Sequence, residues 1–226
     1  MNQASSFSKT ISPEDLICMS DYVWEHPIAI KLEYAQENNL LFGEQIYKTG
    51  AKLWLYKDLA KIVIEASQRV YKETGGTLVL YDGLRVTDAQ AKMLETQRVK
   101  DNPQWLEAPR LLSPPGQGGH PRGMAVDVSI MKEGGEMLDM GTEFDFLAED
   151  PSMSKNPAHR FYPHPDEVKE NRKILNVAMI GAATKFGMRI NPLPQEWWDY
   201  RLPDDVYNEY APLSDADLPE FMRLME

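Results

Sequence analysis

The sequence contains one cysteine and four histidines among 226 residues, which limits the kinds of site that it can build. A single cysteine, Cys18, cannot form an intramolecular disulfide or a cysteine-rich zinc site. Any metal site would have to combine few imidazoles with carboxylates, which are the other common protein ligands of zinc. A chain of this length buries enough surface to fold without a disulfide or a structural metal.

Positive charge and long apolar runs are also scarce. Acidic residues outnumber basic ones by 35 to 24, for a formal net charge of -11. Because nucleic-acid binding depends on clustered lysines and arginines, this composition argues against it. No apolar run reaches the roughly 18–20 residues of a membrane span, and the polar start of the chain lacks the apolar core of an export signal. We expect a cytoplasmic protein without nucleic-acid or membrane partners, or a periplasmic one if an export signal has been removed.

Apolar periodicity predicts two long helices, over residues 51–74 and 166–186. Residues 27–34, 77–81, 125–130 and 188–190 have strand patterns, and residues 87–100 resemble a helix. Proline and glycine predict irregular loops at 101–119 and 148–165. Because these elements lack a βαβ rhythm, we predict a single α+β domain, with a mostly antiparallel central sheet flanked by helices. Residues 1–20 are predicted to be an N-terminal extension, and residues 21–226 the domain itself.

The segment from Gly118 to Asp127 combines a histidine with a carboxylate. A bend at Gly123 would place His120 on a loop and Asp127 on the strand that follows, opposite to the valines of that strand. The imidazole and the carboxylate would then converge, as a zinc site requires. A capping histidine and an unrelated surface aspartate explain the spacing equally well.

Two further segments carry candidate site residues. On a strand, Trp197 and Trp198 would point in opposite directions, so that one enters the core and the other walls a cleft. Glu196 and Asp199 flank them and could serve as a base and a metal ligand, although solvent-facing acids beside a tryptophan core are the commoner arrangement.

The turn from Asp82 to Arg85 joins a predicted strand to a predicted helix, where side chains can project into a cleft. An arginine held in such a turn can stabilise an anion. A surface ion pair is the commoner fate of an arginine.

Together these segments resemble the zinc D-peptidase family, which includes the VanX-like D-alanyl-D-alanine dipeptidases and the D-Ala-D-Ala carboxypeptidases. The family pattern S-x-H-x-x-G-x-A-x-D aligns with Gly118, His120, Gly123, Ala125 and Asp127. The D-G/A-Y-R turn aligns with residues 82–85, the E-W-W-H segment with residues 196–199, and the M-G-x-x-F-D stretch with residues 140–145. The order and approximate spacing agree from about residue 28 to residue 201.

This resemblance implies a function and roles for individual residues. Residues 21–226 would be a metallopeptidase-like catalytic domain, a bacterial cell-wall hydrolase acting on D-Ala-D-Ala or a peptidoglycan-derived peptide. Glu196 would be the general base that activates a metal-bound water, and Arg85 would stabilise the tetrahedral intermediate. Asp82, Arg85 and Trp198 would contact the substrate, a small peptide. His120 and Asp127 would be the first two zinc ligands.

The chain departs from the family at the third ligand, where Asp199 replaces a histidine. Asp199 itself can complete a set with His120 and Asp127, and we predict these three residues as the metal ligands. The metal would be zinc, although the more anionic set could favour manganese or iron. Alternatively, His159 or His164 could reach the site from the loop at 148–165.

The same departure leaves two other functions open. One is a catalytically silent D-peptide-binding protein of the same fold. The other is a metal enzyme of different chemistry, such as an iron oxygenase that uses the histidine and carboxylate set. Two smaller departures, Gly118 in place of serine and Leu84 in place of tyrosine, indicate that substrate specificity has changed.

Overall fold

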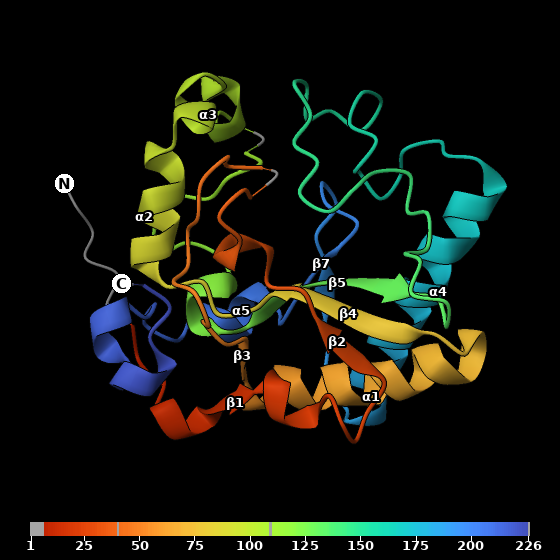
Figure 1. Ribbon diagram of the computed structural model, residues 1–226, viewed down its shortest axis with the longest axis horizontal. Coiled ribbons are helices and arrows are strands. Elements are labelled where there is room, and N and C mark those ends of the chain that lie inside the picture. The colour runs from red at the N-terminus through yellow and green to blue at the C-terminus, as the bar shows by residue number, and fades with distance from the viewer. Residues whose placement is uncertain (1–6, 40, 109, 226) are drawn as a thin grey trace.

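The computed structural model describes residues 7–39, 41–108 and 110–225, so residues 1–6 of the predicted N-terminal extension lie outside the described part. A five-stranded sheet with the order β2-β4-β5-β7-β6 forms its centre (Figure 1). These strands are β2 (Ile28–Ile30), β4 (Thr77–Asp82), β5 (Ala125–Met131), β6 (Asn191–Pro192) and β7 (Asp199–Arg201). Only the β2–β4 pair of this sheet is parallel. The mostly antiparallel sheet, combined with helices, confirms the α+β prediction.

A second, two-stranded antiparallel sheet joins β1 (Leu16–Cys18) to β3 (Trp54–Tyr56). β1 lies inside the segment predicted as an N-terminal extension. Leu16, Cys18 and Met19 are all buried, so this part of the segment contributes to the core.

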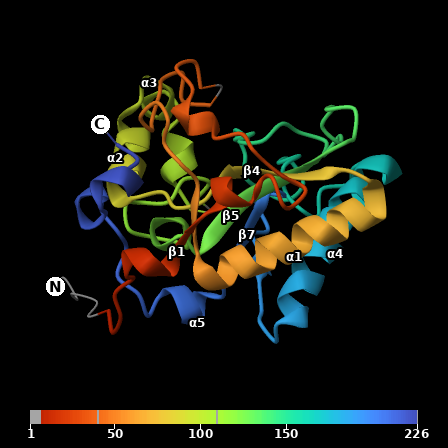
Figure 2. The ribbon, with the colours of Figure 1, turned by 60° about the horizontal axis from the view of Figure 1, so that its bottom comes forward.

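Two long helices, α1 (Lys57–Thr74) and α4 (Asp166–Lys185), pack against each other beneath the central sheet. Figure 2 brings α1 to the front and shows the sheet behind it. On the other side lie α2 (Thr87–Glu95), α3 (Gln97–Lys100) and long loops, whereas α5 (Asp204–Tyr207) follows β7. Short 3-10 helices occur at Pro13–Asp15, Met19–Tyr22, Glu33–Ala35, Pro103–Leu106, His120–Arg122, Asp215–Asp217 and Glu220–Met222. Among the described residues, no helix is both long and apolar enough to cross a bilayer.

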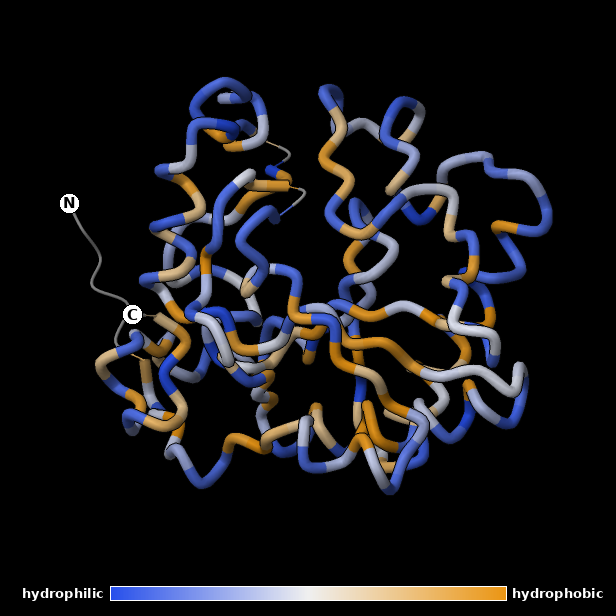
Figure 3. Tube along the Cα trace, viewed as in Figure 1, coloured by the Kyte–Doolittle hydropathy of each residue, from blue (hydrophilic) through white to orange (hydrophobic). Residues whose placement is uncertain are grey.

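The apolar core lies between the sheet and the two long helices. Apolar residues follow the strands and the inner helix faces, and polar residues dominate the loops on the opposite side (Figure 3). Val126, Val128 and Ile130 of β5 join this core, as their alternation predicts. Asp127 and Ser129 point to the other face, yet both are 1% exposed because loops cover that face. The sheet therefore offers a buried polar face on which a site can form.

Three element boundaries were wrong in the sequence-based prediction. The first long helix begins at Lys57, because residues 54–56 pair with β1 as a strand. The predicted helix over 87–100 breaks at Thr96, whose hydroxyl accepts a hydrogen bond from the Val99 backbone and starts α3. The short strand predicted at 188–190 lies at Asn191–Pro192. At the first of these boundaries the pairing of residues 54–56 with β1, a contact outside the local pattern, decides where the helix begins.

Candidate active site

Three carboxylates stand side by side on the buried polar face of the sheet. Asp82 of β4 is paired with Asp127 of β5, and Asp127 is paired with Asp199 of β7. A bulge between Leu80 and Asp82 makes the first pairing possible, since regular pairing would set Tyr81 opposite Asp127. Directly opposed residues point to the same face of a sheet and lie close together. Such a row of like charges requires nearby cations.

His120 supplies one partner of this row. It begins the 3-10 helix His120–Arg122, which ends at Gly123 in the left-handed conformation (φ 62°) and turns the chain into β5. His120 Nδ1 lies 2.8 Å from the carbonyl oxygen of Gly83, to which it donates a hydrogen bond. Nε2 faces Asp127 Oδ1 at 3.5 Å and Asp199 Oδ2 at 3.3 Å. The predicted bend at Gly123 and the convergence of His120 with Asp127 are therefore present.

The charge state of His120 reflects these neighbours. Burial and the charge of Arg85 favour the neutral ring, but the carboxylates of Asp127 and Asp199 outweigh them and raise the pKa of His120 to about 10. The ring is thus protonated at neutral pH when no metal is bound. A metal ion at Nε2 would replace this proton.

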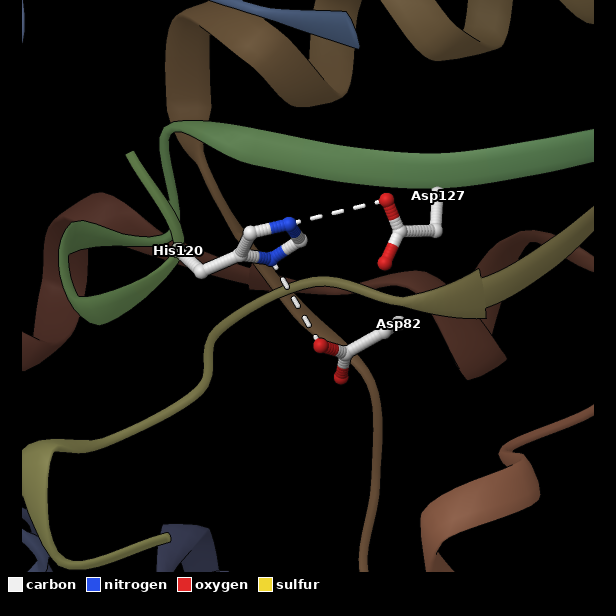
Figure 4. A group of neighbouring side chains, drawn as sticks. All are labelled: Asp82, His120 and Asp127. Atoms are coloured by element: carbon white, nitrogen blue, oxygen red, sulfur yellow. Dashed lines mark ion pairs between the residues drawn. The ribbon is translucent and has the colours of Figure 1, made fainter. Parts of the chain in front are cut away.

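The cluster has the composition and the unsatisfied atom that a cation site needs. Potential ligand atoms of Asp82, His120 and Asp127 lie within 4.8 Å of one another, and all three residues are buried (Figure 4). Asp127 Oδ1 is buried and has no hydrogen-bond partner. A buried acceptor without a partner is costly unless an ion or water satisfies it. These residues therefore fit a bound metal ion.

Asp82 differs from the other two carboxylates in its contacts. Its Oδ1 accepts a hydrogen bond from the Tyr47 hydroxyl at 2.8 Å, and its Oδ2 accepts one from Arg85 Nε at 2.8 Å. It lies nearest His120 Nδ1, at 3.5 Å, and that nitrogen already donates to a backbone carbonyl. Asp82 is therefore placed to orient Arg85 and His120.

Two buried arginines balance the carboxylates. Arg85 Nη2 donates to Asp127 Oδ2 at 3.2 Å, and the Arg85 guanidinium lies over the Tyr34 ring. Arg201 donates to both oxygens of Asp199, through Nε at 2.9 Å and through Nη2. The Arg201 pair helps to hold the pKa of the Asp199 carboxyl far below its usual range in spite of burial. Asp199 is therefore ionised at neutral pH.

A cavity of about 90 Å³ lies in front of this cluster. Arg85, His120, Asp127, Glu196 and Asp199, five of the seven residues predicted for the site, line it. Burial raises the pKa of Glu196 to about 8, and the nearby charges of Asp199 and Asp127 act in the same direction. Its carboxyl group makes no hydrogen bond with another described residue. Glu196 is thus a carboxyl group that can act as an acid or a base, that no hydrogen bond to a described residue holds in place, and that lies beside the candidate metal ligands.

The two remaining predicted residues lie outside the lining of the cavity. Asp82 is fully buried behind Arg85, as its contacts show. Trp198 is 1% exposed and packs edge-on against Phe144 and Trp197. The Trp198 ring belongs to the core, so the structure does not place it in the wall of the cavity, where it could contact a substrate.

Neither histidine of the 148–165 loop lines the cavity. His159 Nδ1 accepts a hydrogen bond from the Phe161 backbone, and His164 Nε2 lies 2.7 Å from the carbonyl oxygen of Pro157. Both rings are therefore engaged within their own loop. Asp199, and not a loop histidine, is the residue that the structure brings to His120.

Asp145 also lines the cavity, and the sequence singled it out only as part of a family stretch. It is the one non-glycine residue with positive φ (61°) among the described residues. Its Oδ2 is buried without a hydrogen-bond partner. Burial raises the pKa of its carboxyl group to about 8, and the charge of Asp127 adds to the effect. Strain and a buried polar atom without a hydrogen-bond partner at one residue are typical of functional positions, and neither is readable from residue order.

An Asp145→Asn variant should be more stable than the wild-type protein when both are metal-free. A carboxyl group whose pKa is raised to about 8 in the fold stays protonated there while it ionises in the unfolded chain, so it lowers stability progressively between about pH 4 and pH 8. The gain from removing it should grow over the same range. Asparagine also tolerates positive φ, and we expect roughly 1 kcal/mol or more at pH 8. Thermal unfolding of chelator-treated protein at pH 5 and pH 8 tests this. The exposed Asp21→Asn is the control, and an equal gain at both pH values would contradict the prediction.

Comparisons with known proteins show what the chain resembles. A family model described as D-ala-D-ala dipeptidase (Peptidase M15) matches residues 19–215. The chain is 30% identical over 177 residues to the D-alanyl-D-alanine dipeptidase of Escherichia coli strain K12, covering 78% of this chain and 79% of that protein. The Serratia marcescens L-Ala D-Glu endopeptidase ChiX has a crystal structure that aligns with a TM-score of 0.38 and 16% identity, over 68% of this chain and 84% of that one.

Proposed function

Because the chain belongs to the D-Ala-D-Ala dipeptidase family of peptidases, we propose that it is a metal-dependent peptidase that cleaves D-Ala-D-Ala or a similarly small D-amino-acid peptide. The observation that carries the proposal is the buried Asp127 Oδ1, which has no hydrogen-bond partner among the described residues and faces His120 Nε2 at 3.5 Å, beside Glu196 in one small cavity. The cavity is small, about 90 Å³, against the roughly 300–1,000 Å³ of pockets for larger ligands, which restricts what can enter it.

The proposed ligands are His120 through Nε2, Asp127 and Asp199. Both carboxylates face Nε2, and the hydrogen bond from Nδ1 to Gly83 leaves Nε2 as the ring nitrogen for the metal. Histidine ligands commonly donate their other N–H to a carbonyl or carboxylate in this way. One histidine with two carboxylates suits zinc, and its anionic character also admits manganese or iron.

The residues around the ligands divide the chemistry among them. When bound, the metal would polarise the scissile carbonyl and acidify the attacking water. Glu196 would take the proton of that water and pass it to the leaving amine. Arg85, held by Asp82 and Asp127, would place a fixed positive charge where the carbonyl oxygen becomes negative. The raised pKa of Glu196 suits a group that holds a proton between the two steps.

Asp145 is the proposed contact for the amino end of the peptide. Its free carboxylate oxygen lies in the same cavity and has no partner in the protein. An ammonium group would satisfy this oxygen and lower the pKa of the carboxyl group from its raised value.

A catalytically silent D-peptide-binding protein is the second candidate. Arg201 occupies both oxygens of Asp199, and a guanidinium in that position competes with a metal for the same carboxylate. Under this alternative the protein would bind D-Ala-D-Ala without turnover.

The test is to measure D-Ala release from D-Ala-D-Ala by protein loaded with zinc, manganese or iron, next to Asp199→His. We expect turnover by the wild-type protein with at least one of these metals. Binding by calorimetry without any product, together with activity gained by Asp199→His, would establish the silent protein instead.

A further inference from the structure

Arg201 places a second fixed cation in the cavity, apart from Arg85. It follows Asp199 by two positions on β7, so both side chains point to the same face of the sheet. The Arg201 side chain is 14% exposed and lines the cavity. Its bonds to Asp199 use Nε and Nη2, and the Tyr207 hydroxyl lies beside the guanidinium. The guanidinium is thus held rigidly at the cavity wall.

The space next to Arg201 is open because residue 118 is glycine. A Cβ atom at Gly118 would lie 3.6 Å from Arg201 Nη1, and no other atom lies within 4 Å of that position. Gly118 has φ 82°, a conformation that strongly favours glycine. A small group can therefore approach Nη1 at this point.

The charges of the cavity are arranged asymmetrically. Asp145 contacts Tyr34 on the side of the site next to β2 and β4. The Tyr34 ring lies under the Arg85 guanidinium. Arg201 lies on β7, beyond the row of carboxylates. A short peptide with free ends carries one positive and one negative charge. With its ammonium group at Asp145, its carboxylate would extend towards β7.

Arg85 is less suited to hold that carboxylate. Its Nε and Nη2 are shared between two carboxylates, those of Asp82 and Asp127, and Nη2 also lies 3.4 Å from the Tyr34 hydroxyl. The same two nitrogens of Arg201 bind the single carboxylate of Asp199. Among the described carboxylates, Arg201 is paired only with Asp199. A metal bound to Asp199 would reduce the negative charge that this carboxylate presents to Arg201. Arginine offers a planar set of donors that matches a carboxylate.

We propose that Arg201 binds the C-terminal carboxylate of the peptide, so that the protein selects peptides whose scissile bond precedes a free C-terminal residue. This inference rests on the proposed function and adds the residue that sets substrate length. Gly118 leaves the room for the contact, and Arg201 supplies the charge.

The experiment compares kcat/KM for D-Ala-D-Ala and for its C-terminal amide, in the metal-loaded wild-type protein, Arg201→Met and Arg201→Lys. A charged hydrogen bond of this kind corresponds to roughly 10–100-fold, so the wild-type protein should prefer the free acid by about that factor. Arg201→Met should lose the preference through a higher KM for the acid, and Arg201→Lys should keep part of it. The acid-to-amide ratio is insensitive to any general loss caused by a shifted Asp199.

Two arginine controls separate this role from others. Arg189→Met removes an exposed arginine paired with Asp205 and should keep the wild-type ratio. Arg110→Met removes another arginine that lines the cavity, and a ratio lost there instead of at Arg201 would overturn the proposal.

The remaining outcomes are equally decisive. Equal cleavage of acid and amide by the wild-type protein would overturn the role of Arg201 and leave the peptidase function intact. Cleavage of neither substrate with any metal would instead refute the proposed function. If Arg201→Met loses its metal, the ratio in Arg201→Lys decides, and an undiminished ratio in that variant would count against the contact.

Discussion

A Glu196→Gln variant should hydrolyse D-Ala-D-Ala roughly 10²–10⁴-fold more slowly than the wild-type protein, because glutamine cannot accept the proton of the attacking water. Glutamine preserves the size of the side chain, and the Glu196 carboxyl group has no hydrogen-bond partner among the described residues to lose. The fold should therefore persist. Since burial and the neighbouring carboxylates raise the pKa of Glu196 to about 8, removing its charge should not lower the unfolding temperature at neutral pH.

Turnover, metal content and thermal unfolding should be measured on the same preparations. Glu149→Gln, at an exposed position, is the matched control and should retain full activity. Near wild-type turnover in Glu196→Gln with normal metal content would assign the proton transfer to another group.

An Asp127→Asn variant should lose both metal binding and activity. Asparagine has nearly the same shape, but it does not supply the carboxylate oxygen Oδ1, which has no hydrogen-bond partner among the described residues. The metal dissociation constant should rise by more than about 100-fold, the upper range for losing a residue that only orients a ligand. The stabilisation that metal binding gives the folded protein should disappear with it. Metal titration by calorimetry and unfolding with and without metal measure both effects.

The neighbouring carboxylates decide which set holds the metal. If the ligands face His120 Nε2, Asp199→Asn should resemble Asp127→Asn, and Asp82→Asn should weaken the metal by only about 10–100-fold. The opposite order, with Asp82→Asn the more severe, would assign the metal to the compact group of Asp82, His120 and Asp127. The exposed Asp21→Asn should change neither binding nor unfolding.

Much of the fold was predictable because its signals are local. The alternation of residues 125–130 correctly separated the core valines from Asp127, since side chains on a strand alternate between its two faces. The long helices were predicted to within a turn at most ends, because apolar periodicity extends over many residues. The exception is the start of α1, where Trp54, Leu55 and Tyr56 are buried in strand β3 and their apolar character fits either structure.

The sequence indicated which residues belong to the candidate cavity better than it indicated how they are arranged. His120, Asp127, Arg85, Glu196 and Asp199 do share one cavity. The position of Trp198 could not be predicted, because adjacent tryptophans leave open which ring enters the core. Here both rings are buried, and Trp198 packs edge-on between Phe144 and Trp197.

Residue order along the chain determined which chemical groups this protein has and to which face of a strand each side chain points. That information is local, because it follows from the side-chain period of helices and strands and from the few histidines available. Only the tertiary structure set Asp82, Asp127 and Asp199 in one row, through a bulge in β4 and the register of three strands. It also pointed His120 Nε2 at Asp127 and Asp199 and paired Arg201 with Asp199. The three strands carry residues that lie tens of positions apart in the sequence, and the packing of the whole sheet brings them together.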